Sequence, residues 1–96
     1  MQVKITDQAK LDIRNIREYI AKDNKAASAN FAIQLKRTFI NLSIYPKIGR
    51  YRYEFQESDI YTYVFKRYII VYKLSSSELK VLRVLPDYQN AIDNFK

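Results

Sequence analysis

The chain has 96 residues and a net charge of +7 at pH 7, and it contains neither cysteine nor histidine. Those two absences exclude disulfides, thiolate metal sites, histidine-ligated zinc and catalysis by Ser-His-Asp or Cys-His groups. The length suits one domain over residues 1–96, and the positive charge favours nucleic acid, an acidic protein or an anionic membrane as partner.

The first half of the sequence predicts a strand and two helices. Residues 3–5 alternate as in a short strand, and Thr6 is placed to cap a helix over residues 7–23. A second helix is predicted over residues 25–44, and Pro46 ends it. Small residues early in the second helix allow close packing, so we expect an antiparallel hairpin. The apolar stripes are Ala9, Ile13, Ile16 and Ile20 in the first helix and Ala27, Phe31, Leu35, Phe39 and Leu42 in the second.

The second half is rich in β-branched and aromatic residues and predicts four strands near 50–55, 60–66, 68–74 and 78–85. Lys66-Arg67 and residues 75–77 are the predicted turns between the last three strands. Short connections imply antiparallel pairing. The polar tail, residues 87–96, is expected to be a final helical turn or a loose end.

This order of elements predicts an α+β fold. The N-terminal strand and an antiparallel helical hairpin are expected to pack on one face of a mostly antiparallel sheet of three to five strands. The other face of the sheet is then expected to be solvated or used for binding. No run approaches the ~20 apolar residues of a membrane span, and the N-terminus lacks a secretory signal, so we expect a cytoplasmic protein and no membrane partner.

The positive charge is concentrated in residues 36–83, which carry ten basic and four acidic side chains. The planar guanidinium of arginine matches phosphate and carboxylate groups, so this region predicts an anion-binding patch. Alternation along a strand would place Arg50 and Arg52 on one face. The alternative is a solvated sheet face whose surface ion pairs each contribute roughly 0–1 kcal/mol. The candidate binding residues are Arg50, Arg52, Lys66, Arg67 and Arg83.

Nine tyrosines are many for a chain of this length. Aromatic side chains interleaved with cations can stack on nucleic-acid bases or anchor a protein partner. Strand propensity and cross-strand packing are the alternative explanation. Six of them fall in the predicted sheet: Tyr51, Tyr53, Tyr61, Tyr63, Tyr68 and Tyr72.

Five segments, in this order over nearly the whole chain, resemble the RelE/ParE toxin superfamily. They are Ala9-x-x-Asp12-Ile13-x-x-Ile16-x-x-Tyr19-Ile20; Ala26-Ala27 with Phe31 and Leu35; Pro46-x-x-Gly49-Arg50; residues 67–72; and residues 81–85. The resemblance implies the toxin of a type II toxin–antitoxin, or plasmid stabilisation, system, with a cognate antitoxin as its partner. It also implies the two-layer fold predicted above.

The superfamily has two kinds of target. RelE-like members cut messenger RNA in the ribosome, whereas ParE-like members poison DNA gyrase. RelE-like members usually carry basic residues or a His-Tyr pair just after the last strand. Here that stretch is Pro86-Asp87-Tyr88-Gln89-Asn90, with an acid where a ribonuclease would need a cation. The sequence therefore favours the ParE-like side, with a RelE-like ribonuclease and a non-toxic basic binding module as alternatives.

Cleavage of RNA without histidine would need arginines to stabilise the phosphate in the transition state and a tyrosine to move a proton. The set nominated for that role is Arg52, Arg83 and Tyr88. No glycine-rich phosphate loop and no metal-ligand spacing occur, so neither cofactor nor metal is expected. The antitoxin is expected to contribute an acidic segment that wraps the sheet and the hairpin, in a complex that could be a heterotetramer; a toxin homodimer is the other possible assembly.

Overall fold

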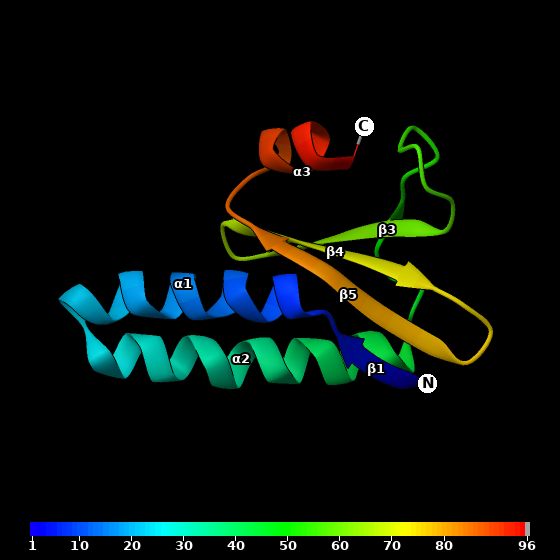
Figure 1. Cartoon of the computed structure of the whole chain (residues 1–96). Coiled ribbons are helices and arrows are strands. Elements are labelled where there is room, and N and C mark those ends of the chain that lie inside the picture. The colour runs from blue at the N-terminus through cyan, green and yellow to red at the C-terminus, as the bar shows by residue number, and fades with distance from the viewer. Residues whose placement is uncertain (96) are drawn as a thin grey trace.

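A computed structural model of the chain describes residues 1–95. Its elements form two layers and a small cap, with the long helices on one face of the sheet and the last helix on the other (Figure 1). They are β1 (Gln2–Ile5), α1 (Asp7–Asp23), α2 (Lys25–Ile44), β2 (Arg50–Tyr51), β3 (Ile60–Phe65), β4 (Tyr68–Leu74), β5 (Glu78–Leu85) and α3 (Tyr88–Phe95).

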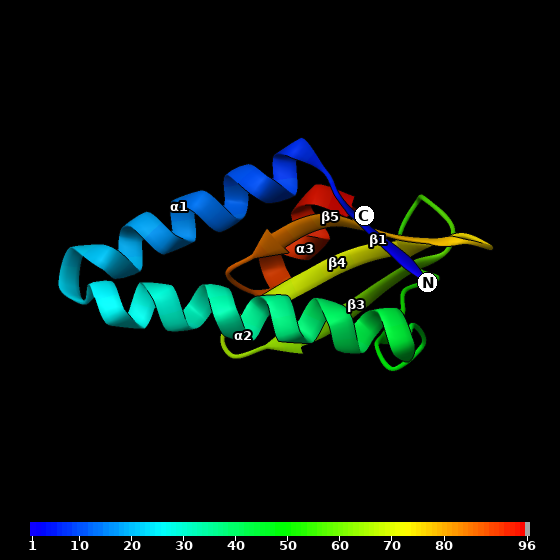
Figure 2. The same ribbon diagram turned by 90° about the horizontal axis from the view of Figure 1, so that it is seen from below.

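The two long helices form the predicted antiparallel hairpin, and a single residue joins them. Asn24 ends α1 with its backbone N–H on the Ile20 carbonyl, and its side chain accepts the Ala27 N–H at the start of α2. The buried hydroxyl of Ser28 donates to the Arg17 carbonyl across the hairpin. From below, the tip of the hairpin projects past the end of the sheet (Figure 2).

The sheet has the strand order β1-β5-β4-β3-β2. β1 pairs with β5 in parallel and all other neighbours are antiparallel, which confirms a mostly antiparallel sheet of five strands. Phe65 pairs with Tyr68, so Lys66 and Arg67 form the predicted two-residue turn. Thr6, between β1 and α1, accepts the Ala9 N–H and donates to the Leu82 carbonyl, which ties the start of α1 to β5.

The main core lies between the hairpin and the sheet. The predicted stripe of α2 is buried there through Phe31, Leu35, Phe39 and Leu42, and the stripe of α1 packs against the same cluster. Burial of these side chains is the dominant driving force for docking the hairpin. The stripes are therefore core, as the spacing predicted.

The predicted strand over residues 50–55 was too long, because β2 ends at Tyr51. The Arg52 N–H still donates to the Ile60 carbonyl of β3. The Phe55 N–H instead donates to the Arg52 carbonyl, which closes a turn. That turn lets Phe55 bury itself on the face of the sheet opposite the hairpin. Burial of one aromatic side chain has outweighed the strand propensity of this segment.

The prediction that this second face is open was also wrong. α3 lies across it (Figure 1), and Ala91 is buried with Ile69, Val71 and Leu85 in a second apolar cluster. Phe95 stacks on Phe55 with ring centroids 5.8 Å apart. The polar tail is therefore a helix of eight residues rather than a single turn or a loose end. Lys96, the last residue of that tail, lies outside the described residues.

Gly49 sits where the chain enters β2, against the hydroxyl of Tyr72 from the centre of the sheet. The Tyr72 hydroxyl donates to the Pro46 carbonyl at 2.8 Å and accepts the Gly49 N–H at 3.2 Å. A Cβ on residue 49 would collide with that hydroxyl oxygen, so only glycine fits. The tyrosine thereby fixes the path of the chain from α2 into the sheet.

Candidate functional site

Arg52 lies just beyond β2 and is almost buried, with 7% of its surface exposed. Its Nε donates to Thr62 Oγ1 at 2.7 Å, and Nη1 lies 3.4 Å from Glu54 and 3.3 Å from the Tyr88 hydroxyl. The guanidinium also lies 4.8 Å from the centre of the Tyr88 ring. Arg52 therefore holds α3 to the sheet through a cation–π contact, while Arg50 on β2 is exposed.

The electrostatics of this corner follow from the same contacts. The pKa of the Glu54 carboxyl is lowered, mainly by a hydrogen bond from its own backbone N–H and then by the charges of Arg52 and Arg50. Glu54 is therefore an anion that partly neutralises the two arginines. Less positive charge remains here for an external ligand than the sequence suggested.

Arg83 is held by a carboxylate from α1. Its Nε and Nη2 donate to the two oxygens of Asp12 at 2.7 and 3.0 Å, and its Nη1 donates to Asn94 of α3. Asp12 also accepts the Val84 N–H at 3.0 Å, so it closes the edge of β5 just beyond the end of β1. The hydrogen bond to Asp12 is the main cause that raises the pKa of Arg83.

The proposed catalytic set is thus only partly assembled. Arg52 and Tyr88 lie in contact, but every nitrogen of Arg83 already donates to a protein oxygen. A phosphate could take the Nε and Nη2 edge of Arg83 only by displacing a bidentate carboxylate from a mostly buried site, which is energetically costly. The geometry suits these three residues to holding α3 against the sheet and α1 better than to cleaving a phosphodiester.

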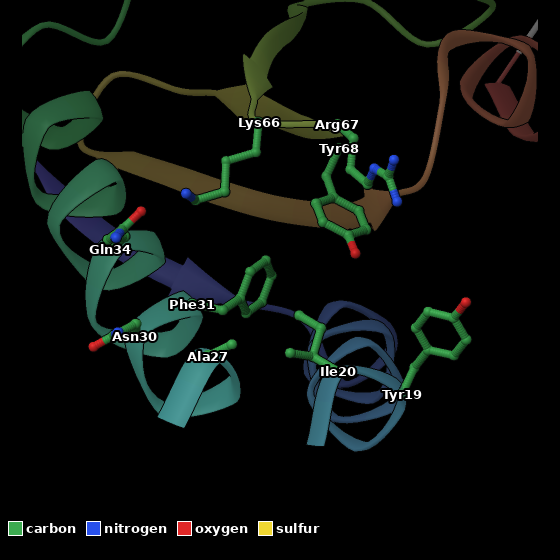
Figure 3. Close-up of a pocket in the computed structure, with 9 residues that line it drawn as sticks. All are labelled: Tyr19, Ile20, Ala27, Asn30, Phe31, Gln34, Lys66, Arg67 and Tyr68. Carbon is green, nitrogen blue, oxygen red and sulfur yellow. The ribbon is translucent and has the colours of Figure 1, made fainter. Parts of the chain in front are cut away.

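Lys66 and Arg67 are the exposed cations of the set, at the turn between β3 and β4. They line a groove of about 550 Å³ between this turn and the helical hairpin (Figure 3). The two cations form one wall of the groove and polar side chains of α2 form part of the other. The residues that line the groove are Tyr19, Ile20, Ala27, Asn30, Phe31, Gln34, Lys66, Arg67 and Tyr68.

The floor of the groove is aromatic. Phe31 packs edge-on against both Tyr68 and Phe65, with ring centroids 5.4 and 5.6 Å apart. Asn30 and Gln34 project from α2 on the side of Phe31 that is away from Ile20 and Tyr19, as Figure 3 shows. An apolar floor flanked by cations and amides suits a carboxylate-bearing peptide segment that also inserts an apolar side chain.

The backbone of Lys66 has φ 55°, in the left-handed region. This is the first residue of a two-residue turn, where glycine is normally favoured because other residues are strained there. The chain nevertheless places a long cation at this position, on the rim of the groove. Such strain points to a use for the side chain, which strengthens the groove as the candidate site.

The five basic candidates therefore do not form one patch. Lys66 and Arg67 share the groove, Arg50 lies exposed on the edge strand, and Arg52 and Arg83 serve internal contacts. Asp12, which the sequence did not predict as a site residue, is largely buried as the partner of Arg83. No local pattern could reveal that pair, because the two residues are 71 positions apart. Asn30 and Gln34 were missed, although their i, i+4 spacing beside Phe31 marks one helix face.

Residues 1–95 contain neither a candidate metal site nor a membrane-spanning helix. Within this range there is no group of three or more acidic side chains that could hold a metal ion. None of the helices in that range is long and apolar enough to cross a bilayer.

Comparison with known proteins places this geometry in a family. A solved structure described as "Chromosomal ParDE TA system from P. aeruginosa" covers 91% of this chain and 96% of its own, with a TM-score of 0.72 and 18% identity. That likeness shows the fold, and no curated protein matches the sequence. The family described as "ParE toxin of type II toxin-antitoxin system, parDE" matches residues 3–90. This confirms the resemblance seen in the sequence, and the chain belongs to the ParE toxin family.

Proposed function

We propose that this protein arrests bacterial growth by binding DNA gyrase in the cytoplasm, and that a cognate antitoxin holds it inactive. The observation that carries the proposal is the family match over residues 3–90. The site supports binding rather than cleavage, because the bidentate contact with Asp12 and the bond to Asn94 already orient the Arg83 guanidinium and partly neutralise it.

The target contact that we propose is the groove between the hairpin and the β3–β4 turn. Lys66 and Arg67 supply positive charge at its rim, and Phe31 and Tyr68 supply an apolar floor. Arg50, exposed on the edge strand, is the third cation that an approaching protein could reach. Cations around an aromatic pocket are typical of the few residues that dominate a protein interface.

Growth of a bacterial host tests the toxin assignment. The gene is induced alone and then together with the gene adjacent to it. Arrest that the adjacent gene relieves is the expected result, since a toxin of this class needs its antitoxin. Normal growth with abundant folded protein would instead favour the non-toxic basic binding module and would remove the basis for a target.

Two assays on the purified protein separate the two kinds of target. We expect inhibition of DNA supercoiling by gyrase, and the double variant Lys66→Ala/Arg67→Ala should weaken it at least tenfold. Arg14→Ala is the control, because Arg14 forms only an exposed i, i+4 ion pair with Glu18. Cleavage of messenger RNA in a translation reaction, with supercoiling unaffected, would replace gyrase with the ribosome.

A further inference from the structure

Helix α2 is apolar on two opposite sides. Its core stripe faces the sheet, but Ile33, Ile40 and Ile44 lie on the other side and are 52%, 53% and 62% exposed. Positions i, i+7 and i+11 of a helix fall on one face, so the three isoleucines form a single row. α2 is the outer layer of the molecule on this side (Figures 1 and 2).

The row continues past the end of the helix. Tyr45 and Ile48, exposed by 60% and 51%, extend it into the turn before β2. Together with Ile44, Pro46 and Lys47 they line a hollow of about 500 Å³. We call the surface made by Ile33, Arg37, Ile40, Ile44, Tyr45 and Ile48 the outer α2 face. Exposed apolar side chains that gather into one continuous surface are typical of a protein-interaction site, so this face is suited to a partner.

The charge of α2 restricts the partner. The helix carries Lys25, Lys36 and Arg37 and contains no aspartate or glutamate, and Lys47 follows it. Arg37 lies on the outer α2 face itself, between Ile33 and Ile40. An acidic segment would meet complementary charge at Lys36, Arg37 and Lys47, whereas a basic segment would be repelled.

A second copy of this chain fits poorly. In a twofold symmetric dimer the same patch meets itself, and because α2 carries cations and no acid, its charges would meet only cations on the α2 of the other copy. Like charges brought together in an interface are unfavourable. The outer α2 face therefore favours a different chain.

We infer that the outer α2 face is the docking surface for an acidic amphipathic helix of the antitoxin. The twelve residues from Ile33 to Ile44 make a row about 16 Å long, which matches three turns of a partner helix. The partner helix would lay apolar side chains between the isoleucines and direct carboxylates at Arg37 and Lys36. The inference rests on the proposed function, since it assumes that an antitoxin exists, and it separates the antitoxin surface from the target groove.

The test uses Ile40→Glu and Arg37→Glu, which make this face repel an acidic helix. Leu11→Glu is the matched control, because Leu11 is an exposed apolar residue on the other long helix. Each variant is induced alone and with the adjacent gene, and the affinity of the purified variant for the adjacent gene's purified product is measured. We expect both α2 variants to arrest growth without relief and to bind at least tenfold more weakly, with the control changed less than twofold.

The outcomes separate the inference from the proposed function. If the unchanged chain is not relieved by its neighbour, the proposed function fails. If it is relieved and the α2 variants are relieved equally well, the inference alone fails. Loss of growth arrest in a variant whose circular dichroism is native would assign the face to the target, and a wild-type dimer that Ile40→Glu dissociates would assign it to self-association. Should Ile40→Glu not fold, Ile40→Ser replaces it with the same expected direction.

Discussion

Tyr72 joins the turn before β2 to the centre of the sheet through its hydroxyl group. Replacing it with phenylalanine leaves the Pro46 carbonyl and the Gly49 N–H without that partner in a confined site. We expect Tyr72→Phe to lower the free energy of unfolding by about 1–3 kcal/mol. Urea denaturation measures the loss, and Tyr53→Phe is the control, because Tyr53 is 82% exposed.

The same residue predicts a dependence on pH. Burial, as the main cause, raises the pKa of Tyr72 from 10.0 to about 12. The unfolded chain therefore releases this proton at a lower pH than the folded chain does. Stability contributed by Tyr72 is complete below pH 10 and is lost as the pH rises toward 12. Denaturation at several alkaline pH values should show a smaller decline for Tyr72→Phe than for the unchanged chain; equal slopes would contradict the assignment.

Asp12 is the second residue that joins distant segments. Asp12→Asn removes the charge that Arg83 binds while keeping an oxygen for the Val84 N–H. Because the pair is largely buried, we expect a loss of roughly 2–4 kcal/mol in the free energy of unfolding. Glu18→Gln, in an exposed pair with Arg14, should cost less than about 0.5 kcal/mol. Similar losses in both variants would show that the Arg83 contact has no special weight.

At the scale of elements, Lys66 in the β3–β4 turn lowers the stability of the fold while it supplies a cation to the groove. Lys66→Gly relieves the positive φ of this residue and should raise the free energy of unfolding by about 0.5–1 kcal/mol. Lys66→Ala, which removes the charge but keeps the strain, should give no such gain. Thermal unfolding compares the two, and both variants should inhibit gyrase less well. If Lys66→Gly is no more stable than Lys66→Ala, the positive φ of Lys66 costs the fold no measurable stability.

The sequence predicted elements whose pattern is local and missed those set by tertiary contacts. The helices follow from apolar residues three and four positions apart. Asn24 is a residue type that commonly caps helices, so the boundary between α1 and α2 can also be predicted from the sequence. β2 was drawn four residues too long because its aromatic content resembles a strand, whereas Phe55 is needed beneath α3. α3 itself had a signal in the spacing of Tyr88, Ala91 and Phe95, which its many polar residues obscured.

The site was harder to predict, because exposure decides which cations are available. Nothing in the sequence distinguishes the exposure of Arg52 from that of Lys66. In the structure Arg52 is buried against Thr62, whereas Lys66 lines the groove. Among the partners of these arginines, Tyr88 of α3 lies 36 positions from Arg52 and Asp12 of α1 lies 71 positions from Arg83. The composition predicts that the surface is positively charged, but only the fold determines which cations are exposed and where they lie.

At the scale of the whole molecule, a charge of +7 acts on any acidic partner before contact. We expect the association rate with the product of the adjacent gene to fall at least tenfold between about 0.05 and 0.5 M salt, because screening shortens the reach of the field. The dissociation rate should change much less. Stopped-flow measurements distinguish the two, and an association rate independent of salt would contradict electrostatic steering.

The pairing of β1 with β5 brings the first residues of the chain against some of the last. During synthesis the N-terminal strand has no neighbour until residues 78–85 have left the ribosome, and the bond between Asp12 and Arg83 must wait as long. A nascent chain that stops at residue 77 should accordingly be cut rapidly by protease, and the released chain slowly. Completion of the five-stranded sheet is therefore tied to the synthesis of residues 78–85, and every surface that depends on the complete sheet forms after them.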